Sequence, residues 1–316
     1  MSTRLNLTLQ RSQALTERIY ELEWASSDGR PLPQAQAGAH LEFYLPNGLV
    51  RHYSLLDDGH NGVYRIGVLR DPQSRGGSDW LTRQPAGTQL EASAPRNHFA
   101  LDDSPGKQRV LLGAGIGITP IVAMVRALVA RGERPQLHYL VRTADDAAYA
   151  DELSQWLPET HWQLHLSEPH GAVDPASLID TVTADTQVYA CGPQGFLDRL
   201  EQAAQQWPAG VLRLERFRGD SDADSRTTQA CEVVLQRSGK TLLLAPGESL
   251  MAALQDAGVA PPTLCGEGAC GTCAVGIIAG EAEHADVLQS DAEKQCHDTL
   301  YPCVSAPKGQ RLVLDL

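Results

Sequence analysis

The first hundred residues place apolar and polar side chains in short alternating runs, and turn-forming residues separate many of these runs. Alternation is already present in residues 1–9, while 46–48 (Pro-Asn-Gly) and 58–62 (Asp-Gly-His-Asn-Gly) have the composition of turns. Many short strands with frequent turns predict an antiparallel sandwich or barrel, which we assign to residues 1–103. The expected strands are Ile19–Trp24, His40–Leu45, Val50–Leu56, Tyr64–Arg70 and Gln89–Ser93, with one short helix at Ser78–Arg83.

Between residues 104 and 219, strand-like and helix-like patterns alternate. Asp174-Pro175 has the form of an N-cap followed by proline at the first helical position. This alternation predicts βα units built on a parallel sheet. The expected strands are Val110–Leu112, Leu137–Val141, His161–Leu166, Gln187–Ala190 and Val211–Phe217, and the expected helices are Thr119–Arg131, Asp145–Leu157 and Pro193–Trp207.

The last third of the chain follows a polar segment, 220–228, which lacks hydrophobic anchors and is typical of a linker. In the part that follows, 229–316, a hairpin about Ser238-Gly239 is expected, then a helix over Ser249–Ala257 that Gly258 ends. The sequence therefore predicts three domains, which is reasonable for 316 residues. The hairpin strands are Cys231–Leu235 and Lys240–Leu244, and a further strand is expected over Ala274–Ile278.

Net charge and apolar content restrict the class of protein. The net charge of −13 without a basic cluster argues against binding of nucleic acid. The N-terminus has no apolar core of signal-peptide length, and the longest apolar stretch, 110–125, falls short of the ~18 residues expected of a membrane span. We therefore expect a cytoplasmic protein without a membrane segment, and we expect a monomer.

Four cysteines have the most informative spacing in the chain. Cys265, Cys270 and Cys273 form C-x4-C-x2-C, and Cys303 follows after a long gap, which is the plant-type [2Fe–2S] pattern. Glycines within this run let the backbone fold tightly around a small cluster. A zinc site is the alternative, but zinc sites usually combine two short Cys/His couplets, and this run supplies one.

The fourth ligand is not fixed by spacing, because Cys296 competes with Cys303. We favour Cys303, since 301–304 (Tyr-Pro-Cys-Val) has the character of a strand edge returning to the loop. The total of seven cysteines is odd, so a pure disulfide framework is not expected. Free thiolates indicate a reducing compartment.

A glycine-rich turn follows the strand at 110–112 and opens the next helix. Gly113, Gly115 and Gly117 form G-x-G-x-G, which lets a pyrophosphate approach backbone N–H groups at a helix N-terminus. The pattern differs from the usual G-x-G-x-x-G dinucleotide fingerprint, and Arg142-Thr143 stands where an acidic residue is expected. The alternative is that these glycines serve only close packing of helix on strand.

Two further motifs suggest ligand contacts. Cys191-Gly192-Pro193 ends another strand of the same sheet, where a flat nicotinamide ring could enter, although the same residues could simply start a helix. In the barrel, Arg51-His52-Tyr53-Ser54 lies on a strand, with Arg51 and Tyr53 on one face. The run Arg75-Gly76-Gly77-Ser78 precedes the short helix and could cradle a phosphate, while the alternative for each arginine is a solvated surface residue.

Taken in order, these motifs resemble the phthalate dioxygenase reductase family, which includes the vanillate demethylase reductases. The resemblance covers essentially the whole chain, to the closing 312–316. It implies an antiparallel FMN-binding β-barrel (1–103), an α/β NADH-binding domain with a parallel sheet (104–219), and a C-terminal β-grasp ferredoxin domain (229–316). The motifs that carry it are Arg51-x-Tyr53-Ser54, Arg75-Gly76-Gly77-Ser78, Gly113-x-Gly115-x-Gly117-x-Thr119-Pro120, Cys191-Gly192-Pro193 and the cysteine loop.

The resemblance also implies roles for individual residues. Tyr53 and Ser54 would contact the isoalloxazine ring, with Ser54 near N5, where it could assist hydride transfer. Thr119 would approach the flavin from the nucleotide-binding domain, and Phe217 would cover it; a core phenylalanine at a strand end is the alternative. The remaining residues expected at the cofactors are Arg51 and Arg75 to Ser78 for the FMN phosphate and ribityl chain, Gly67, Val68 and Leu69 for the ring, and His52.

The expected function follows from the same resemblance: a reductase passes electrons from NADH through FMN to a [2Fe–2S] cluster and on to a terminal Rieske-type aromatic oxygenase. We predict NADH because Asp145 and Asp146 oppose the 2′-phosphate that Arg142 would attract. No acid–base pair is assigned, because hydride transfer depends on stacking and orientation. The alternatives are a reductase for another acceptor, such as a monooxygenase or amine-oxidising system, and a non-catalytic iron–sulfur redox sensor.

Overall fold

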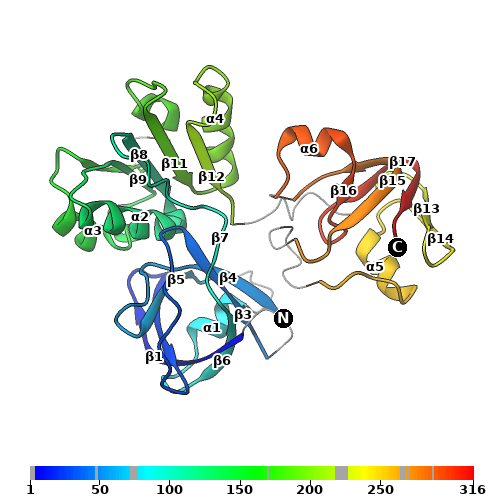
Figure 1. The fold of residues 1–316 in the computed structure, drawn as a ribbon, viewed down its shortest axis with the longest axis horizontal. Coiled ribbons are helices and arrows are strands. Elements are labelled where there is room, and N and C mark those ends of the chain that lie inside the picture. Colours follow the sequence, from blue (N-terminus) through cyan, green and yellow to red (C-terminus); the bar gives the residue numbers. More distant parts are fainter. Residues whose placement is uncertain are drawn as a thin grey trace. The chain divides into compact units, whose positions relative to one another are not determined.

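The computed structural model describes residues 4–46, 49–71, 77–168, 171, 173–217, 227–263, 268, 271–286 and 288–316 (Figure 1). The chain divides into two compact units, Met1–Arg216 and Phe217–Leu316. None of the helices in the described ranges has the length and apolar content needed to cross a membrane.

The N-terminal part of the first unit is an antiparallel barrel, as the alternation predicts. Its strands follow the order β4-β3-β6-β1-β2-β5, and a bridge between Leu55 and Ile66 joins the β4 side to the β5 side. The core holds Trp24 and Phe43, whose ring centroids are 5.1 Å apart. The elements are β1 (Arg4–Ala14), β2 (Ile19–Ser26), β3 (Ala39–Tyr44), β4 (Val50–Ser54), β5 (Val63–Leu69), α1 (Ser78–Thr82), β6 (Gln89–Ser93) and β7 (Arg96–Asn97).

The rest of the first unit is an α/β domain with a fully parallel sheet, ordered β10-β9-β8-β11-β12. The parallel direction brings the carboxyl ends of β8, β11 and β12 to one edge, where ligands bind in such sheets. The elements are β8 (Gln108–Ala114), η1 (Gly115–Gly117), α2 (Ile118–Ala130), β9 (Gln136–Val141), η2 (Ala144–Asp146), α3 (Ala150–Trp156), β10 (Trp162–Leu166), η3 (Pro175–Leu178), β11 (Thr186–Cys191), α4 (Gln194–Ala204) and β12 (Leu212–Glu215).

The prediction of one continuous helix over 145–157 is wrong. A 3-10 turn comes first, closed by reciprocal hydrogen bonds between Thr143 and Asp146, and α3 begins later. Tyr149, between them, adopts a left-handed backbone with φ 65°, which interrupts the helical repeat. The interruption turns the Tyr149 side chain into a buried position. The strand predicted over 211–217 is also shorter and ends at Glu215.

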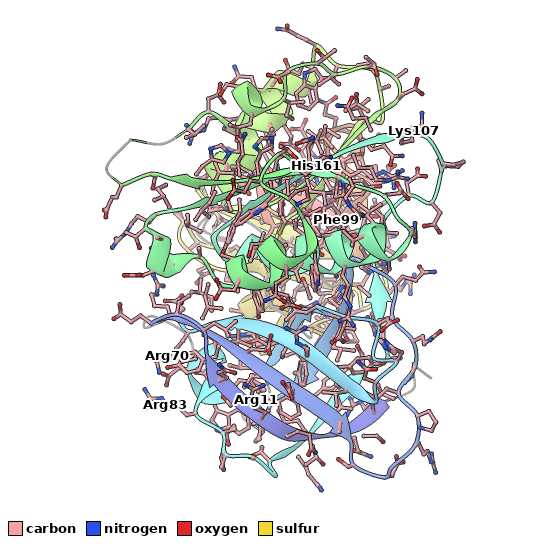
Figure 2. The ribbon with its side chains drawn as sticks, turned by 90° about the vertical axis from the view of Figure 1, so that its left-hand side faces the viewer. Arg11, Arg70, Arg83, Phe99, Lys107 and His161 are labelled. Carbon is pink, nitrogen blue, oxygen red and sulfur yellow. The ribbon has the colours of Figure 1, made fainter. Side chains whose placement is uncertain are left out.

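Several contacts join the barrel to the α/β domain within the first unit. Arg65 on β5 pairs with Glu152 on α3, and Phe99, in the connecting segment, packs edge-on against Tyr189 of β11, with ring centroids 5.7 Å apart. Figure 2 labels Phe99 and shows Arg11, Arg70 and Arg83 on the barrel. These contacts fix how the two parts of the first unit meet.

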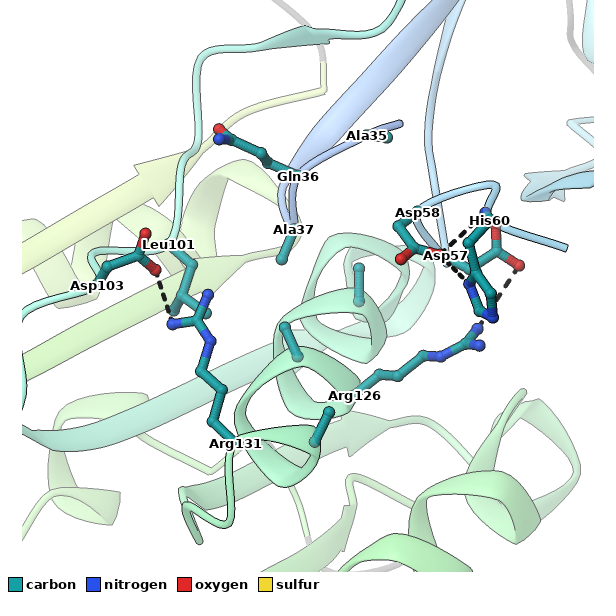
Figure 3. A pocket seen from close by; sticks show the side chains of 13 residues that line it. Ala35, Gln36, Ala37, Asp57, Asp58, His60, Leu101, Asp103, Arg126 and Arg131 are labelled. Atoms are coloured by element: carbon teal, nitrogen blue, oxygen red, sulfur yellow. Dashed lines mark hydrogen bonds and ion pairs between the residues drawn. The ribbon is translucent and has the colours of Figure 1, made fainter. Parts of the chain in front are cut away.

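A cavity of about 450 Å³ lies where α2 faces the barrel loop at 57–60. Figure 3 shows Arg126 pointing toward Asp57 and His60, and Arg131 pointing toward Asp103. The Arg126 guanidinium is 3.6 Å from the Asp57 carboxylate, and Arg131 is 2.7 Å from Asp103. The two ion pairs border the cavity and tie the helix to its neighbours.

The second unit is a mixed sheet in the order β14-β13-β17-β15-β16, in which β13 and β17 run parallel and the other neighbours are antiparallel. The predicted hairpin and helix are present, and the Ser249 side chain caps α5 at the Ala252 N–H. Helix α6 is absent from the sequence predictions. The elements are β13 (Cys231–Leu235), β14 (Lys240–Leu244), α5 (Leu250–Asp256), β15 (Val275–Glu283), α6 (Asp291–Cys296), β16 (Thr299–Leu300) and β17 (Ala306–Leu314).

Candidate functional site

The barrel strand β4 carries the first set of predicted ligand residues. Arg51 pairs in register with Phe43, and Tyr53 pairs with Leu41, so both side chains share one face of the sheet. The Tyr53 ring lies 6.0 Å from the Phe43 ring in an edge-on arrangement. A Cβ on Gly77 would lie 2.4 Å from Arg51 Nε, so the glycine allows the guanidinium to approach the start of α1.

Ser54, at the end of β4, has the feature expected of a residue that awaits a ligand. Its side chain is 4% exposed, and its Oγ has no hydrogen-bond partner among the described residues. A buried hydroxyl without a partner costs about 1–3 kcal/mol, so native structures usually satisfy it with protein, water or ligand. The Ser54 hydroxyl therefore fits a polar edge of a bound ring, such as that of a flavin.

Gly67 on β5 and Thr119 on α2, both predicted at the flavin, lie in close contact. A Cβ at Gly67 would be 2.5 Å from Thr119 Cγ2 and 2.8 Å from Tyr149 Oη. The Thr119 hydroxyl donates a hydrogen bond to the Ile116 carbonyl, which leaves its methyl group facing the barrel. Val68 is buried and Leu69 half-buried on the same strand, whose backbone was predicted to line the ring.

The phosphate side of the predicted flavin site is described only in part. Arg75 and Gly76 lie outside the described residues. Ser78 opens α1, and its Oγ accepts a hydrogen bond from the Asp71 N–H at 3.2 Å. This bond holds Asp71, just after β5, against the start of α1.

The glycine-rich turn serves packing at two positions and leaves one position open. A Cβ at Gly113 would lie 3.1 Å from Ile118 Cα, and one at Gly117 would lie 2.3 Å from the Cys191 carbonyl oxygen. Gly115 differs, because it has φ +55° and no atom within 4 Å of a Cβ position. The packing interpretation therefore accounts for Gly113 and Gly117, and Gly115 is the glycine beside which a ligand has room.

At the neighbouring strand ends, the structure brings Cys191 beside Glu215, which sequence reasoning missed as a site residue. The two are register partners on β11 and β12. Burial raises the pKa of Glu215 to about 8 and also raises the pKa of the Cys191 thiol. Glu215 Oε2 has no hydrogen-bond partner among the described residues. A protonated carboxyl here can donate a hydrogen bond to a ligand. The one sequence indication of Glu215 was its place in the Glu-Arg-Phe run at the end of a strand.

Gly192 and Pro193 complete this edge. A Cβ at Gly192 would be 2.7 Å from Ala114 Cβ and 2.9 Å from Phe196, so β8, β11 and α4 converge there. Pro193 has extended backbone angles and is the N-cap of α4. Phe217 follows β12 and is half-buried, and its contact with a flavin stays a prediction.

Arg142 lies at the end of β9, at the edge where an adenosine ribose is expected. Its side chain is 72% exposed, and its Nε is 3.7 Å from Glu168 Oε1. Asp146 is engaged in the hydrogen bonds with Thr143 that close η2. The arginine is thus exposed to solvent and partly compensated by a carboxylate, which weakens its attraction for a phosphate.

In the second unit, Cys273 and Cys303 come together. Their Sγ atoms are 3.2 Å apart without a disulfide, although 30 positions separate them. Two sulfurs bound to one metal ion at about 2.3 Å each must lie within about 4.6 Å of one another, so this pair fits a shared ion. Cys296 instead lies exposed on α6 and donates to the Ala292 carbonyl. Cys265 and Cys270 lie outside the described residues.

The expectation that Cys303 sits on a strand edge is wrong, because residues 301–304 form a turn between β16 and β17. The nearby Gly268, in the predicted ligand loop, has φ +67°, and a Cβ there would lie 2.5 Å from Val304 Cγ2. Asp286 packs against the same glycine, and its Oδ2 accepts from the Leu288 and Gln289 N–H groups. These contacts hold Gly268 against the turn that carries Cys303.

Comparison with known proteins adds family-level findings. Residues 233–308 match the 2Fe-2S iron-sulfur cluster binding domain, and residues 111–202 match the oxidoreductase NAD-binding domain. The chain is 35% identical to phthalate dioxygenase reductase of Burkholderia cepacia, covering 99% of this chain and 97% of that protein. A solved structure of phthalate dioxygenase reductase superimposes with a TM-score of 0.76 at 35% identity, covering 99% of this chain and 98% of the other.

Two other relatives are similar over their full lengths. The chain is 38% identical to a putative toluene-4-sulfonate monooxygenase system reductase subunit of Comamonas testosteroni, with 100% of both chains covered. It is 40% identical to the beta subunit of a heme-dependent oxidative N-demethylase of Ectopseudomonas mendocina, again with 100% of both covered. Relatives of similar identity thus carry names with different oxygen-using partners.

Proposed function

Because this chain belongs to the phthalate dioxygenase reductase-like family, and is an NAD(P)H-dependent flavin and iron–sulfur oxidoreductase, we propose that it is an NADH-specific, FMN-containing reductase that supplies electrons to a terminal oxygenase. Family, fold class and enzyme class agree with the predictions from the sequence motifs. The observation that carries the proposal is the pair Cys273 and Cys303, whose sulfurs meet at 3.2 Å in a chain that also holds a barrel and a parallel nucleotide-type sheet.

FMN would convert the two-electron hydride donor into single electrons for a [2Fe–2S] cluster. Arg51 and the start of α1 would hold the FMN phosphate, and the buried Ser54 hydroxyl would contact the ring. FMN is preferred over a larger flavin on the family resemblance. Among the described residues, the close approach of Gly77 to Arg51 supports a compact phosphate-binding corner.

The nicotinamide end of NADH would bind at the carboxyl ends of β11 and β12. Gly115 would leave room for the pyrophosphate near the start of α2, where the backbone N–H groups of a helix N-terminus can bind it. Glu215, kept neutral by burial, would donate a hydrogen bond to the nicotinamide carboxamide. Cys191 would line the site as a protonated, unreactive thiol. These residues orient the ring; the transfer needs no acid–base pair.

The choice of NADH over NADPH rests on the surroundings of Arg142. This arginine is exposed and has Glu168 at 3.7 Å, so it offers a phosphate one solvated cation beside a carboxylate. The measurement is kcat/KM for each nucleotide. Comparable values for NADH and NADPH would contradict the proposed specificity.

The acceptor proposed first is a Rieske-type aromatic oxygenase. Relatives named for phthalate and vanillate systems support it at 35% identity each. A heme-dependent N-demethylase is the second candidate, because its beta subunit is 40% identical over the whole chain. Turnover with each purified oxygenase in turn separates the two.

The first experiment is an anaerobic titration of the purified protein with NADH, followed by visible absorbance and low-temperature EPR. Flavin bleaching together with a rhombic [2Fe–2S] signal is the expected result. A cluster signal that requires dithionite, with no flavin reduced by NADH, would contradict the reductase and favour an iron–sulfur redox sensor.

A further inference from the structure

Three potential metal ligands share one face of the β3–β4 ladder in the barrel. His40 and Glu42 are two positions apart on β3, and His52 on β4 is the register partner of Glu42. Since side chains alternate along a strand, all three lie on the face opposite Leu41 and Phe43, which belong to the barrel core. One ligand atom from each lies within 4.8 Å of the other two.

The two β3 residues are held in a largely dry environment. His40 is 9% exposed and Glu42 is 1% exposed. Both side chains are therefore shielded from bulk water on this face of the sheet, so a bound ion would be held mainly by protein ligands.

Polar neighbours orient the Glu42 carboxylate but occupy only part of its hydrogen-bond acceptor capacity. Tyr44 donates a hydrogen bond to Glu42 Oε2 at 3.0 Å, and Arg96 donates to Oε1 at 2.7 Å. A carboxylate has about four lone-pair positions, so capacity for a metal ion remains. The Arg96 side chain is 34% exposed, so its charged group can move toward solvent when a cation binds. Such hydrogen-bonding neighbours are a regular feature of metal sites.

Two other histidine pairs provide an internal comparison. His138 and His165 have ring nitrogens 3.1 Å apart, and so do His284 and His297. In the described part of the chain, neither pair has a third ligand atom within 4.8 Å of both rings, although Asp286 Oδ1 lies 4.0 Å from His284 Nδ1. Glu42 thus distinguishes the β3–β4 group from a simple stack of imidazoles.

We propose that His40, Glu42 and His52 form a binding site for a divalent transition-metal ion, with Zn²⁺ as the favoured occupant. Two imidazoles and one carboxylate are a known zinc donor set, which leaves a fourth position for water. The bound ion ties β3 to β4, the strand that carries Arg51 and Ser54. The site therefore links a metal ion to the order of the predicted flavin-binding strand, and it does not depend on the identity of the acceptor.

The direct test is X-ray absorption at the zinc edge on holoprotein loaded with one equivalent of Zn²⁺. The expected spectrum has only nitrogen and oxygen ligands, at about 2.0–2.1 Å. Sulfur at about 2.3 Å would place the ion on cysteines and overturn the proposal. Because this measurement uses the unaltered protein, it tests the site independently of whether the variants fold.

Calorimetric titration with Zn²⁺ against a competing chelator measures the affinity in variants. His52→Gln is expected to weaken binding about a hundredfold, which corresponds to about 2.7 kcal/mol. The matched variant His138→Gln, in a pair without a carboxylate, is expected to bind as the unaltered protein does. Unchanged affinity in His52→Gln, or an equal loss in His138→Gln, would overturn the site.

Arg96→Gln provides a test in the opposite direction. Arg96 competes with the metal for Glu42, so its removal is expected to tighten Zn²⁺ binding about tenfold, or about 1.4 kcal/mol. In the double variant Arg96→Gln/Glu42→Gln, the tighter Zn²⁺ binding expected of Arg96→Gln should be absent. Affinity that stays unchanged or falls in Arg96→Gln would exclude Glu42 as a ligand.

Discussion

Arg65 in barrel strand β5 donates two hydrogen bonds to Glu152 in helix α3, one to each carboxylate oxygen, at 3.0 and 2.8 Å. Its Nη2 also donates to Glu21 of β2 at 2.7 Å. These side chains are mostly buried, and the pair joins the barrel to the α/β domain. The two carboxylates raise the pKa of Arg65 further above its ordinary value, against the opposing effect of its burial. The arginine is therefore a fixed cationic link between the two parts.

Removing one partner of this link should loosen the first unit. Glu152→Gln is expected to lower the free energy of unfolding by about 1–3 kcal/mol, because the pair is partly solvated, and to slow flavin reduction by NADH. Chemical denaturation and stopped-flow absorbance measure the two effects. Asp185→Asn, which removes an exposed pair with Lys107, is the control and should change neither.

Gly67→Ala should disturb the same junction by overpacking. The new Cβ would lie 2.5 Å from Thr119 Cγ2, which predicts a loss of about 1–3 kcal/mol in the free energy of unfolding. The double variant with Thr119→Ser removes that methyl group and should recover part of the loss. Additive effects in a double-mutant cycle would show that the two residues do not compete for this space.

Cys303→Ser is expected to abolish the [2Fe–2S] EPR signal while leaving reduction of the flavin by NADH intact. The reason is the 3.2 Å separation from Cys273, which fits two sulfurs on one iron. Cys296→Ser should retain the cluster, because that thiol is exposed on α6. Loss of the cluster in Cys296→Ser alone would reassign the fourth ligand.

Glu215 should make stability depend on pH in a defined direction. Burial raises its folded-state pKa from 4.5 to about 8, so the unfolded chain ionises first as the pH rises. The contribution of Glu215 to the free energy of unfolding is complete below about pH 4.5. It falls between about pH 4.5 and 8 and is constant above that range. Glu215→Gln should remove up to about 3–5 kcal/mol of this dependence at 1.36 kcal/mol per pKa unit. Denaturation of both proteins across the range measures the difference; parallel curves would contradict the assignment.

Docking to the terminal oxygenase should weaken with salt. The part of the chain from Cys231 onward holds eleven Asp and Glu residues against five Lys and Arg residues, which favours a basic partner surface. Because the screening length falls to about 3 Å at 1 M salt, turnover with the oxygenase should drop as ionic strength rises. Reduction of a small artificial acceptor is the control and should change little. Indifference of oxygenase turnover to salt would exclude electrostatic docking.

Local sequence determined much of this protein. Alternation predicted the barrel strands, βα alternation predicted the parallel sheet, and C-x4-C-x2-C predicted the cluster loop, because each depends on neighbours a few positions apart. Boundaries were less accurate where one residue changes the backbone. Tyr149, with φ 65°, splits a segment whose composition is helical throughout, and no local pattern marks that change.

Tertiary structure decided which distant residues meet. The pairing of β11 with β12 brings Glu215 beside Cys191, the β3–β4 register joins His40 and Glu42 to His52, and the turn after β16 brings Cys303 to Cys273. These contacts depend on strand order and register, which no short segment encodes. The sequence by itself therefore determined the fold class and the family, and the fold decided which side chains become buried neighbours and how their protons and charges behave.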